Sequence, residues 1–168
     1  TLHLLMKELC KIKGIRWIRV LYCYPEEIYD ELIQVMKEEK KICHYLDLPI
    51  QHASDRILKR MGRRTTRAQL TATIEKLRKE IPDIVLRTTL ITGFPGETEE
   101  DHQELMEFVD EMEFDRLGAF TYSPEEGTPA ETMEDQIPEE IKEERRDEIM
   151  ELQQEISLEK GNDRIGQE

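Results

Sequence analysis

No apolar run in the 168-residue sequence approaches the length of a membrane-spanning helix, which needs about 18 to 20 apolar residues. No secretory signal peptide opens the chain either. We therefore expect a soluble protein of the cytoplasm that has no membrane partner. The sequence starts at Thr1, without a Met and inside a helical pattern, so we expect a piece of a longer protein. Its length suits one hydrophobic core and hence one domain.

Cysteine is scarce, because the chain holds only Cys10, Cys23 and Cys43, at spacings of 13 and 20 residues. These spacings form no Cys-x-x-Cys pair and match no zinc or iron–sulfur motif. We therefore predict that the chain supplies no metal ligands. Three unpaired cysteines are typical of small buried hydrophobic side chains in a reducing compartment.

Short motifs of common catalytic sites are also missing: there is no Walker loop, no H-E-x-x-H and no nucleophile elbow. His52 is able to act as a general base near neutral pH, but no partner stands at short spacing, so catalytic residues stay unassigned. Arg63 and Arg64 are able to clamp a carboxylate, or simply to lie solvated at a helix end.

Positive charge is in deficit, since 24 Lys and Arg side chains face 38 Asp and Glu, for a formal net charge of −14. Residues 131–160 alone hold twelve acidic and four basic side chains. This acidity argues against non-specific binding of a phosphate backbone by that segment. A basic group elsewhere keeps the possibility open, and it comprises Lys59, Arg60, Arg63, Arg64 and Arg67.

Apolar periodicity predicts strands that alternate with helices. Repeated βα units indicate a parallel sheet with right-handed crossovers, and both a doubly wound sheet and a (β/α) barrel fit. Four units fall short of a closed eight-stranded barrel, so a partial barrel is the economical barrel form. Trp17, Ile18, Val20 and Leu21 are expected to supply the apolar bulk of the first strand. The expected strands are 15–22, 45–50, 84–91 and 117–122; the expected helices are 2–12, 25–40, 54–61, 66–81, 98–112 and 138–160.

The segment Ile84–Thr98 is the most informative stretch of the chain. Its apolar run predicts a strand buried on both faces, and Gly93–Gly96 forces a tight turn. Thr98, with Asp101 as its partner, predicts a capped helix. Backbone N–H groups converge at such a helix start, which favours a ligand site, although an ordinary strand–helix turn has the same pattern. In a barrel, polar groups at the carboxyl ends of the strands line one cavity.

Three ordered segments carry a family resemblance: YLDLPIQHASDRILKRMGR (Tyr45–Arg63), LRTTLITGFPGET (Leu86–Thr98) and GAFTYSPEEGTPA (Gly118–Ala130). Together they resemble the radical S-adenosylmethionine (SAM) methylthiotransferases. The segments PIQHASD and FTYSPEEGT are most similar to those of the RimO branch, which methylthiolates an aspartate of a small-subunit ribosomal protein. The sister branches modify adenosines of tRNA.

The resemblance implies an α/β fold, a partial (β/α)6 TIM-like barrel of which about four parallel βα units and a long C-terminal helix are present. Residues 1–160 would be the C-terminal two-thirds of that domain, and 161–168 would begin a linker to a C-terminal β-domain. The full-length family carries two [4Fe–4S] clusters. Its C-x-x-x-C-x-x-C cluster loop has no match here, so we expect this chain to be inactive alone.

The resemblance also implies half of a SAM site. Gln51 and Thr89 would hydrogen-bond the ribose, and Arg63 would meet the carboxylate of SAM bidentately. Phe120 and Tyr122 would close the cavity at the last strand. The residues that would line the adenine are Ile91, Gly93, Phe94, Pro95 and Glu97.

The chemistry implied by the resemblance is reductive cleavage of SAM to a 5′-deoxyadenosyl radical, sulfur insertion through the second cluster, and methyl transfer from a second SAM. Two other hypotheses remain open from the sequence. One is a fragment of a tRNA (adenosine) methylthiotransferase. The other is a small α/β phosphate-binding module that uses the Gly93–Gly96 turn without radical chemistry.

Overall fold

Within residues 1–163 and 165–166, which the computed structural model describes, four strands form one parallel sheet in the order β1-β2-β3-β4. Each strand pairs with the next one along the chain. A doubly wound sheet reverses its strand order at a switch point, whereas a barrel keeps the chain order, so this sheet is an arc of a barrel. The strands are β1 (Ile18–Val20), β2 (Ile42–Asp47), β3 (Val85–Thr92) and β4 (Arg116–Thr121).

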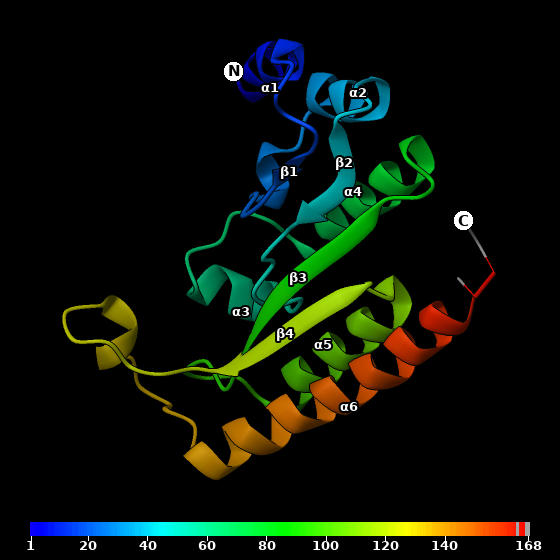
Figure 1. Cartoon of the computed structure of the whole chain (residues 1–168). Helices are drawn as coiled ribbons and strands as arrows, with labels where there is room; N and C mark the ends of the chain where they lie inside the picture. Colours follow the sequence, from blue (N-terminus) through cyan, green and yellow to red (C-terminus); the bar gives the residue numbers. More distant parts are fainter. Residues whose placement is uncertain (164, 167–168) are drawn as a thin grey trace.

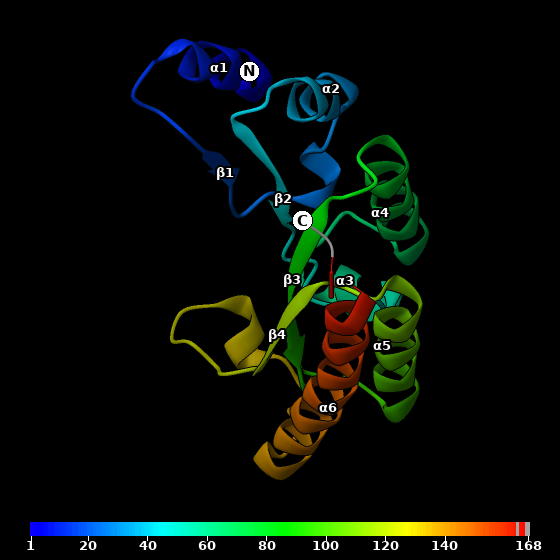
Figure 2. The ribbon, with the colours of Figure 1, turned by 45° about the vertical axis from the view of Figure 1, so that its right-hand side comes forward.

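Four of the helices cover one face of the sheet. Figures 1 and 2 show α2, α4, α5 and α6 on the same side of the strands, while the opposite face is bare. This arrangement confirms the expected partial barrel, whose interior is the bare face. The helices are α1 (Leu2–Lys11), η1 (Pro25–Glu27), α2 (Asp30–Glu38), α3 (Asp55–Arg60), α4 (Arg67–Glu80), α5 (Glu99–Met112), η2 (Pro129–Thr132) and α6 (Glu139–Asp163).

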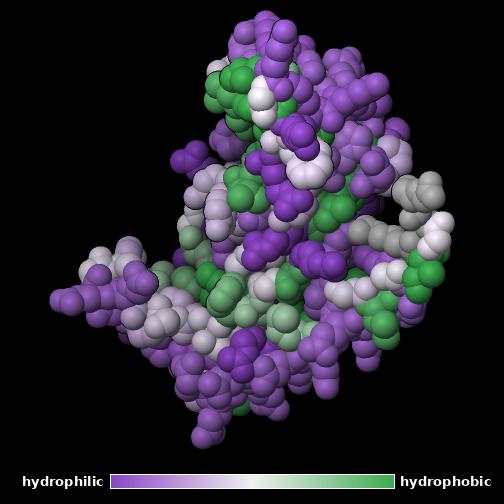
Figure 3. All heavy atoms as spheres, viewed as in Figure 1, coloured by the Kyte–Doolittle hydropathy of each residue, from purple (hydrophilic) through white to green (hydrophobic). Residues whose placement is uncertain are grey.

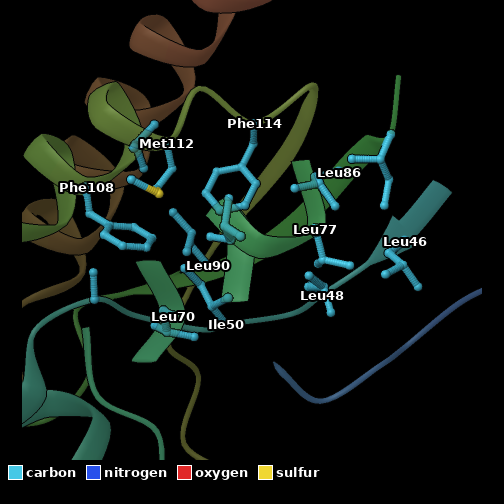
Figure 4. Packing of buried hydrophobic residues seen from close by; sticks show 14 of the residues in the cluster. Leu46, Leu48, Ile50, Leu70, Leu77, Leu86, Leu90, Phe108, Met112 and Phe114 are labelled. Atoms are coloured by element: carbon cyan, nitrogen blue, oxygen red, sulfur yellow. The ribbon is translucent and has the colours of Figure 1, made fainter. Parts of the chain in front are cut away.

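The core lies between the sheet and these helices. Figure 4 shows Leu86 and Leu90 of β3 packed toward Phe108 of α5 and toward Phe114, which precedes β4. All four side chains are fully buried. Burying an aromatic or leucine side chain contributes about 1.5–3 kcal/mol, so this layer supplies much of the drive for folding.

The expectation that β3 is buried on both faces is wrong. Its side chains alternate between buried, from Leu86 to Thr92, and half-buried, from Val85 to Ile91. Because the helices cover only one face, every second residue points into the open interior of the barrel arc. Arg87 and Thr89 belong to this interior row, and the interior position explains why polar side chains interrupt the apolar run.

The first expected strand is too long. β1 covers only Ile18–Val20, and its register with β2 is irregular. Trp17 and Leu21, expected to supply its apolar bulk, are 81% and 50% exposed. β1 pairs only with β2 within the described residues, so its other edge has no ladder to extend or cover it.

Two further elements differ from expectation. β2 begins at Ile42 rather than Tyr45, and Pro49, which has no N–H to donate, lies beyond its end. The expected helix 25–40 is divided into η1 and α2, because Ile28 and Tyr29 adopt extended backbone between them. The hydroxyl of Tyr29 there accepts a hydrogen bond of 3.2 Å from the backbone N–H of His3, which ties α1 to this loop.

Helix starts follow the sequence signals closely. The capping box of Thr98 with Asp101 is confirmed, and Thr66 forms a second capping box with Gln69. Ser54 stands at the N-cap of α3 but makes no capping hydrogen bond. Its hydroxyl donates instead to Asp101 Oδ1 at 2.6 Å, because that buried carboxylate is the stronger acceptor.

The last helix runs to Asp163, so residues 161–163 of the expected linker are helical. Residues 164, 167 and 168 of that linker lie outside the described residues. Ile141 of this helix is 36% exposed. The buried side of α6 consists of Lys142, Arg145, Ile149, Gln153 and Ile156. No helix of the described chain is both long enough and apolar enough to cross a lipid bilayer.

Candidate functional site

A cavity of about 560 Å³ opens at the carboxyl ends of β2, β3 and β4. Figure 3 shows apolar side chains gathered on this side of the molecule, beside the base of the loop that projects after β4. The volume lies within the range of roughly 300–1,000 Å³ that small-molecule sites occupy. Its lining residues are Gln51, Met61, Arg63, Thr89, Ile91, Phe94, Phe120, Thr121, Tyr122, Ser123, Glu125, Thr128 and Ala130.

Seven of the ten site residues expected from the sequence line this one cavity. The polar members are Gln51, Arg63 and Thr89, and the apolar and aromatic members are Ile91, Phe94, Phe120 and Tyr122. The other three, Gly93, Pro95 and Glu97, do not line it. The residues that sequence reasoning missed are mostly in the segment 121–130, whose small and polar side chains carry no periodic signal.

Gln51 occupies a strained position that fixes its place at the cavity. Its φ is +70°, in the left-handed region that side chains with a Cβ rarely adopt. Its backbone N–H donates to the carbonyl of Thr89 at 3.0 Å, and its carbonyl accepts from the N–H of Ile91 at 2.8 Å. These two bonds attach Gln51, which lies beyond the end of β2, to β3. Such strain is typical of functional positions.

Arg63 is placed by the end of α3. Gly62, at φ +74°, and the following residue donate their N–H groups to the carbonyls of Lys59 and Leu58, at 3.1 and 2.9 Å, in a Schellman pattern. The Arg63 guanidinium lies 5.0 Å from the centroid of the Tyr24 ring. Within the described residues it forms no ion pair with a carboxylate. The side chain also borders two adjoining cavities of about 450 and 210 Å³.

An aromatic pair, Phe94 and Tyr122, forms one wall of the cavity. The rings of Phe94 and Tyr122 meet edge to face, with centroids 5.2 Å apart at 70°. Together with Ile57 they make a small buried cluster against which Met61 and Ile91 pack. The Tyr122 hydroxyl is buried without a hydrogen-bond partner in the described part of the chain. Burial, with a smaller contribution from Glu131, raises the pKa of Tyr122.

The buried carboxylate of Glu97 binds backbone N–H groups of the turn after β3. Its Oε2 accepts the backbone N–H groups of Gly93 at 2.9 Å and of Phe94 at 3.3 Å. Its Oε1 accepts from Arg145 Nη1 of α6 at 3.0 Å. The N–H groups that a phosphate would need are therefore bonded within the protein, which removes the basis for a phosphate-binding turn.

Two arginines of α3 donate hydrogen bonds to carbonyl oxygens of the same turn. Arg56 Nη2 donates to the carbonyl of Gly96 at 2.7 Å, and Arg60 Nε donates to the carbonyl of Pro95 at 2.9 Å. Arg56 also pairs with Asp101 of α5. Burial acts to raise the pKa of Asp101, but hydrogen bonds from Arg56, Ser54 and Thr98 outweigh it and hold that pKa well below its usual value.

His52 is fully buried and does not line the cavity. Its Nδ1 accepts the backbone N–H of Ser54 at 3.0 Å, and its Nε2 lies 3.4 Å from Glu97 Oε2. The imidazole therefore supports the turn from below and has no route to a ligand as a general base.

The three cysteines are half-buried and unpaired, and Cys10 and Cys23 pack against the core. Among the described residues, no group of three or more His, Cys, Asp or Glu side chains is arranged to hold a metal ion. Burial raises the pKa of the Cys23 thiol, with a smaller contribution from Asp47. Cys23 borders the cavity of about 210 Å³ beside Gln51 and Arg63.

Gly93→Ala tests how tightly the turn is packed. At φ +69°, a Cβ is strained by about 1–2 kcal/mol, and here it would also overlap the Lys142 side chain, adding about 1–3 kcal/mol. Gly127→Ala is the control, because φ is +81° but no atom lies within 4 Å. Urea denaturation should give the larger loss for Gly93→Ala; equal losses in the two variants would contradict the packing described.

Asp101→Asn tests the carboxylate network. The folded pKa of Asp101 lies below the unfolded value of about 3.9, so its stabilisation is present above that value and is lost as the pH falls through the folded pKa. The variant should lose about 1.5–3 kcal/mol in urea denaturation at pH 7, and less at pH 3. Asp110→Asn, exposed on the same helix, should change little at either pH. If the loss for Asp101→Asn is no smaller at pH 3 than at pH 7, the lowered pKa of Asp101 is contradicted.

Known radical SAM proteins share the sequence pattern and the fold of this chain. Residues 2–109 match the radical SAM superfamily. The radical S-adenosylmethionine methyltransferase TsrM from Kitasatospora setae superposes with a TM-score of 0.57 at 17% identity, over 71% of this chain and 24% of that one. SuiB from Streptococcus suis superposes with a TM-score of 0.54 at 17% identity, over 89% and 32%. At these identities the likeness concerns the fold alone.

The curated relatives are far more similar in sequence. The ribosomal protein uS12 methylthiotransferase RimO of Lachnoclostridium phytofermentans is 65% identical over 162 residues, 96% of this chain and 37% of that protein. RimO of Clostridium perfringens is 58% identical over 167 residues, 99% and 38%. The chain thus spans a little over a third of the length of these relatives, and the similarity confirms the resemblance to RimO. With its family match over more than half of its length and its barrel-arc fold, the chain belongs to the radical SAM superfamily.

Proposed function

We propose that this chain forms one wall of the SAM site in a RimO-type methylthiotransferase that modifies an aspartate of a small-subunit ribosomal protein. The observation that carries the proposal is the convergence of seven expected side chains on one cavity. Three of them are polar and four are apolar or aromatic, the mixture that an adenosine with an amino-acid tail requires.

The residues around the cavity fit the parts of SAM. Gln51 and Thr89, whose backbones are hydrogen-bonded to each other, provide amide and hydroxyl groups for the ribose. Ile91, Phe94 and Tyr122 provide an apolar face for the adenine, and the unpartnered Tyr122 hydroxyl is available to a polar group of the ligand. Arg63, which has no carboxylate partner within the described residues, is suited to the carboxylate.

SAM and the [4Fe–4S] clusters of the family supply the radical, sulfur and methyl chemistry, while the protein binds, orients and excludes water. The relatives extend well beyond this chain, and no metal-holding group is present in the described residues. We therefore propose that both clusters are held by residues outside this chain, and that residues 1–160 form the C-terminal two-thirds of the barrel domain. The exposed Trp17 and Leu21 beside the unpaired edge of β1 support a further barrel unit there. A linker from 161 onward would lead to a β-domain.

The acceptor distinguishes RimO-type function from tRNA modification. A form of the protein extended to the length of its relatives, reconstituted with iron and sulfide without oxygen, should transfer a methylthio group to ribosomal protein uS12 and not to tRNA. Mass spectrometry of both acceptors measures this. Methylthiolated tRNA with unmodified uS12 would instead support the tRNA enzyme. We expect the reaction in the cytoplasm, where the ribosomal protein is assembled.

Arg63→Ala tests the assignment of the carboxylate. S-adenosylhomocysteine stands in for SAM, and 5′-methylthioadenosine shares its adenosine but lacks the amino-acid tail. Loss of a charge-assisted pair should weaken S-adenosylhomocysteine by about 10- to 100-fold and leave 5′-methylthioadenosine nearly unchanged, measured by calorimetry.

Arg64→Ala is the matched control, because Arg64 is the exposed neighbour and does not line the cavity of about 560 Å³. It should leave both affinities within about twofold, less than the 1.4 kcal/mol of a tenfold change. Equal weakening of the two ligands by Arg63→Ala would contradict the carboxylate contact.

A further inference from the structure

Two polar side chains of α6 hold the two ends of β4. Lys142 Nζ donates to the carbonyl of Tyr122, just after the strand, at 2.9 Å. Gln153 Nε2 donates to the carbonyl of Phe114, just before the strand, at 2.8 Å. Both side chains are almost fully buried, at 5% and 4% exposed. α6 therefore runs antiparallel to β4, as Figure 1 shows, and is fastened to it at each end.

Lys142 lies on the part of α6 that is near the cavity. It contacts both segments that carry the aromatic wall, the turn after β3 and the end of β4. Its Nζ lies 5.4 Å from the centroid of the Tyr122 ring. Its methylene stem fills the space beside Gly93, so closely that a Cβ at Gly93 would overlap it. Its carbonyl accepts the hydroxyl of Thr92, the last residue of β3, at 3.0 Å. One side chain thus joins the turn after β3 to the end of β4.

Burying the ammonium group of Lys142 carries a desolvation cost. An apolar side chain of the same shape would avoid the desolvation cost. For a buried charge, the hydrogen bonds and ion pairs with its partners often do no more than offset that cost. The ammonium here is held by the Tyr122 carbonyl and by Glu139 Oε2 at 3.1 Å. What the charge adds over a hydrophobic side chain is a directed hydrogen bond that fixes one carbonyl in place.

We propose that Lys142 is a positioning residue for the aromatic wall of the cavity. By fixing the end of β4 relative to the turn after β3, it sets the spacing of Phe94 and Tyr122 and so the affinity for the adenosine part of the ligand. Lys142 does not line the cavity and acts through Tyr122. The ligand identity rests on the proposed function; the geometry of the wall does not.

Lys142→Met in the full chain keeps the shape of the stem and removes the donor. The matched control is Gln153→Met, which removes the equivalent hydrogen bond at the distant end of β4. Both variants should lower the Tm, but only Lys142→Met should weaken ligand binding. We expect about a tenfold rise in Kd, by the same factor for 5′-methylthioadenosine and S-adenosylhomocysteine, because the wall meets the part that they share.

Unchanged affinity in Lys142→Met, or equal weakening in both variants, overturns the proposal, since the second result is what a purely structural role gives. If Lys142→Met does not fold, Lys142→Gln, with a donor on a shorter stem, decides by the same criteria, with a smaller expected loss.

A second readout needs no ligand. Aromatic NMR should show cross-relaxation between the Phe94 and Tyr122 rings in the parent chain and in Gln153→Met, and its loss in Lys142→Met. Retained cross-relaxation in Lys142→Met overturns the proposal. If the parent chain binds neither nucleoside, the assignment of this wall to SAM fails, and this readout still decides the role of Lys142.

Discussion

Glu97 places a buried carboxylate beneath the turn that joins β3 to α5, and the rest of the site depends on that group. It gathers two backbone N–H groups of the turn and the guanidinium of Arg145, with His52 alongside. Removing one partner of such a buried pair commonly costs about 3–5 kcal/mol, because the other charge is left without compensation. The turn is therefore a rigid element, and Phe94, which it carries, enters the cavity at a fixed position.

Elements distant in sequence converge on this turn. α3 contributes two arginines to its carbonyl oxygens, and α6 contributes Arg145 below and Lys142 beside it. The cavity is thus built in two layers, with aromatic and polar side chains lining it and a charged layer that holds their backbone. The proposed function requires such rigidity, since orientation of the bound molecule and exclusion of water are the contributions of the protein.

Much of the fold was accessible from the sequence because strong local signals agree with the tertiary structure. The β3 strand and the Thr98 capping box lie within a residue of expectation, since apolar runs, turn glycines and caps act locally. The failures arise where tertiary context decides. β1 is short and pairs irregularly with β2, which its apolar run does not signal, and β3 has one open face because the helices cover only the other. Glu97, expected at the adenine, lies beneath the turn, since its carboxylate is drawn to the N–H groups there. A signal for the charged layer was present: Lys142, Arg145, Ile149, Gln153 and Ile156 recur at helical spacing, but polar side chains at those positions look like a solvated face.

The central claim is that the carboxyl ends of β2, β3 and β4 hold the adenosine of SAM. An NMR titration of the 15N-labelled chain with S-adenosylhomocysteine tests it most directly. The account predicts that the largest shifts fall on the backbone of Gln51, Thr89, Ile91 and Tyr122, around the cavity of about 560 Å³. Shifts confined to the opposite ends of the strands, where Trp17 and His44 border a cavity of about 400 Å³, would contradict it. So would the absence of any shift at saturating ligand.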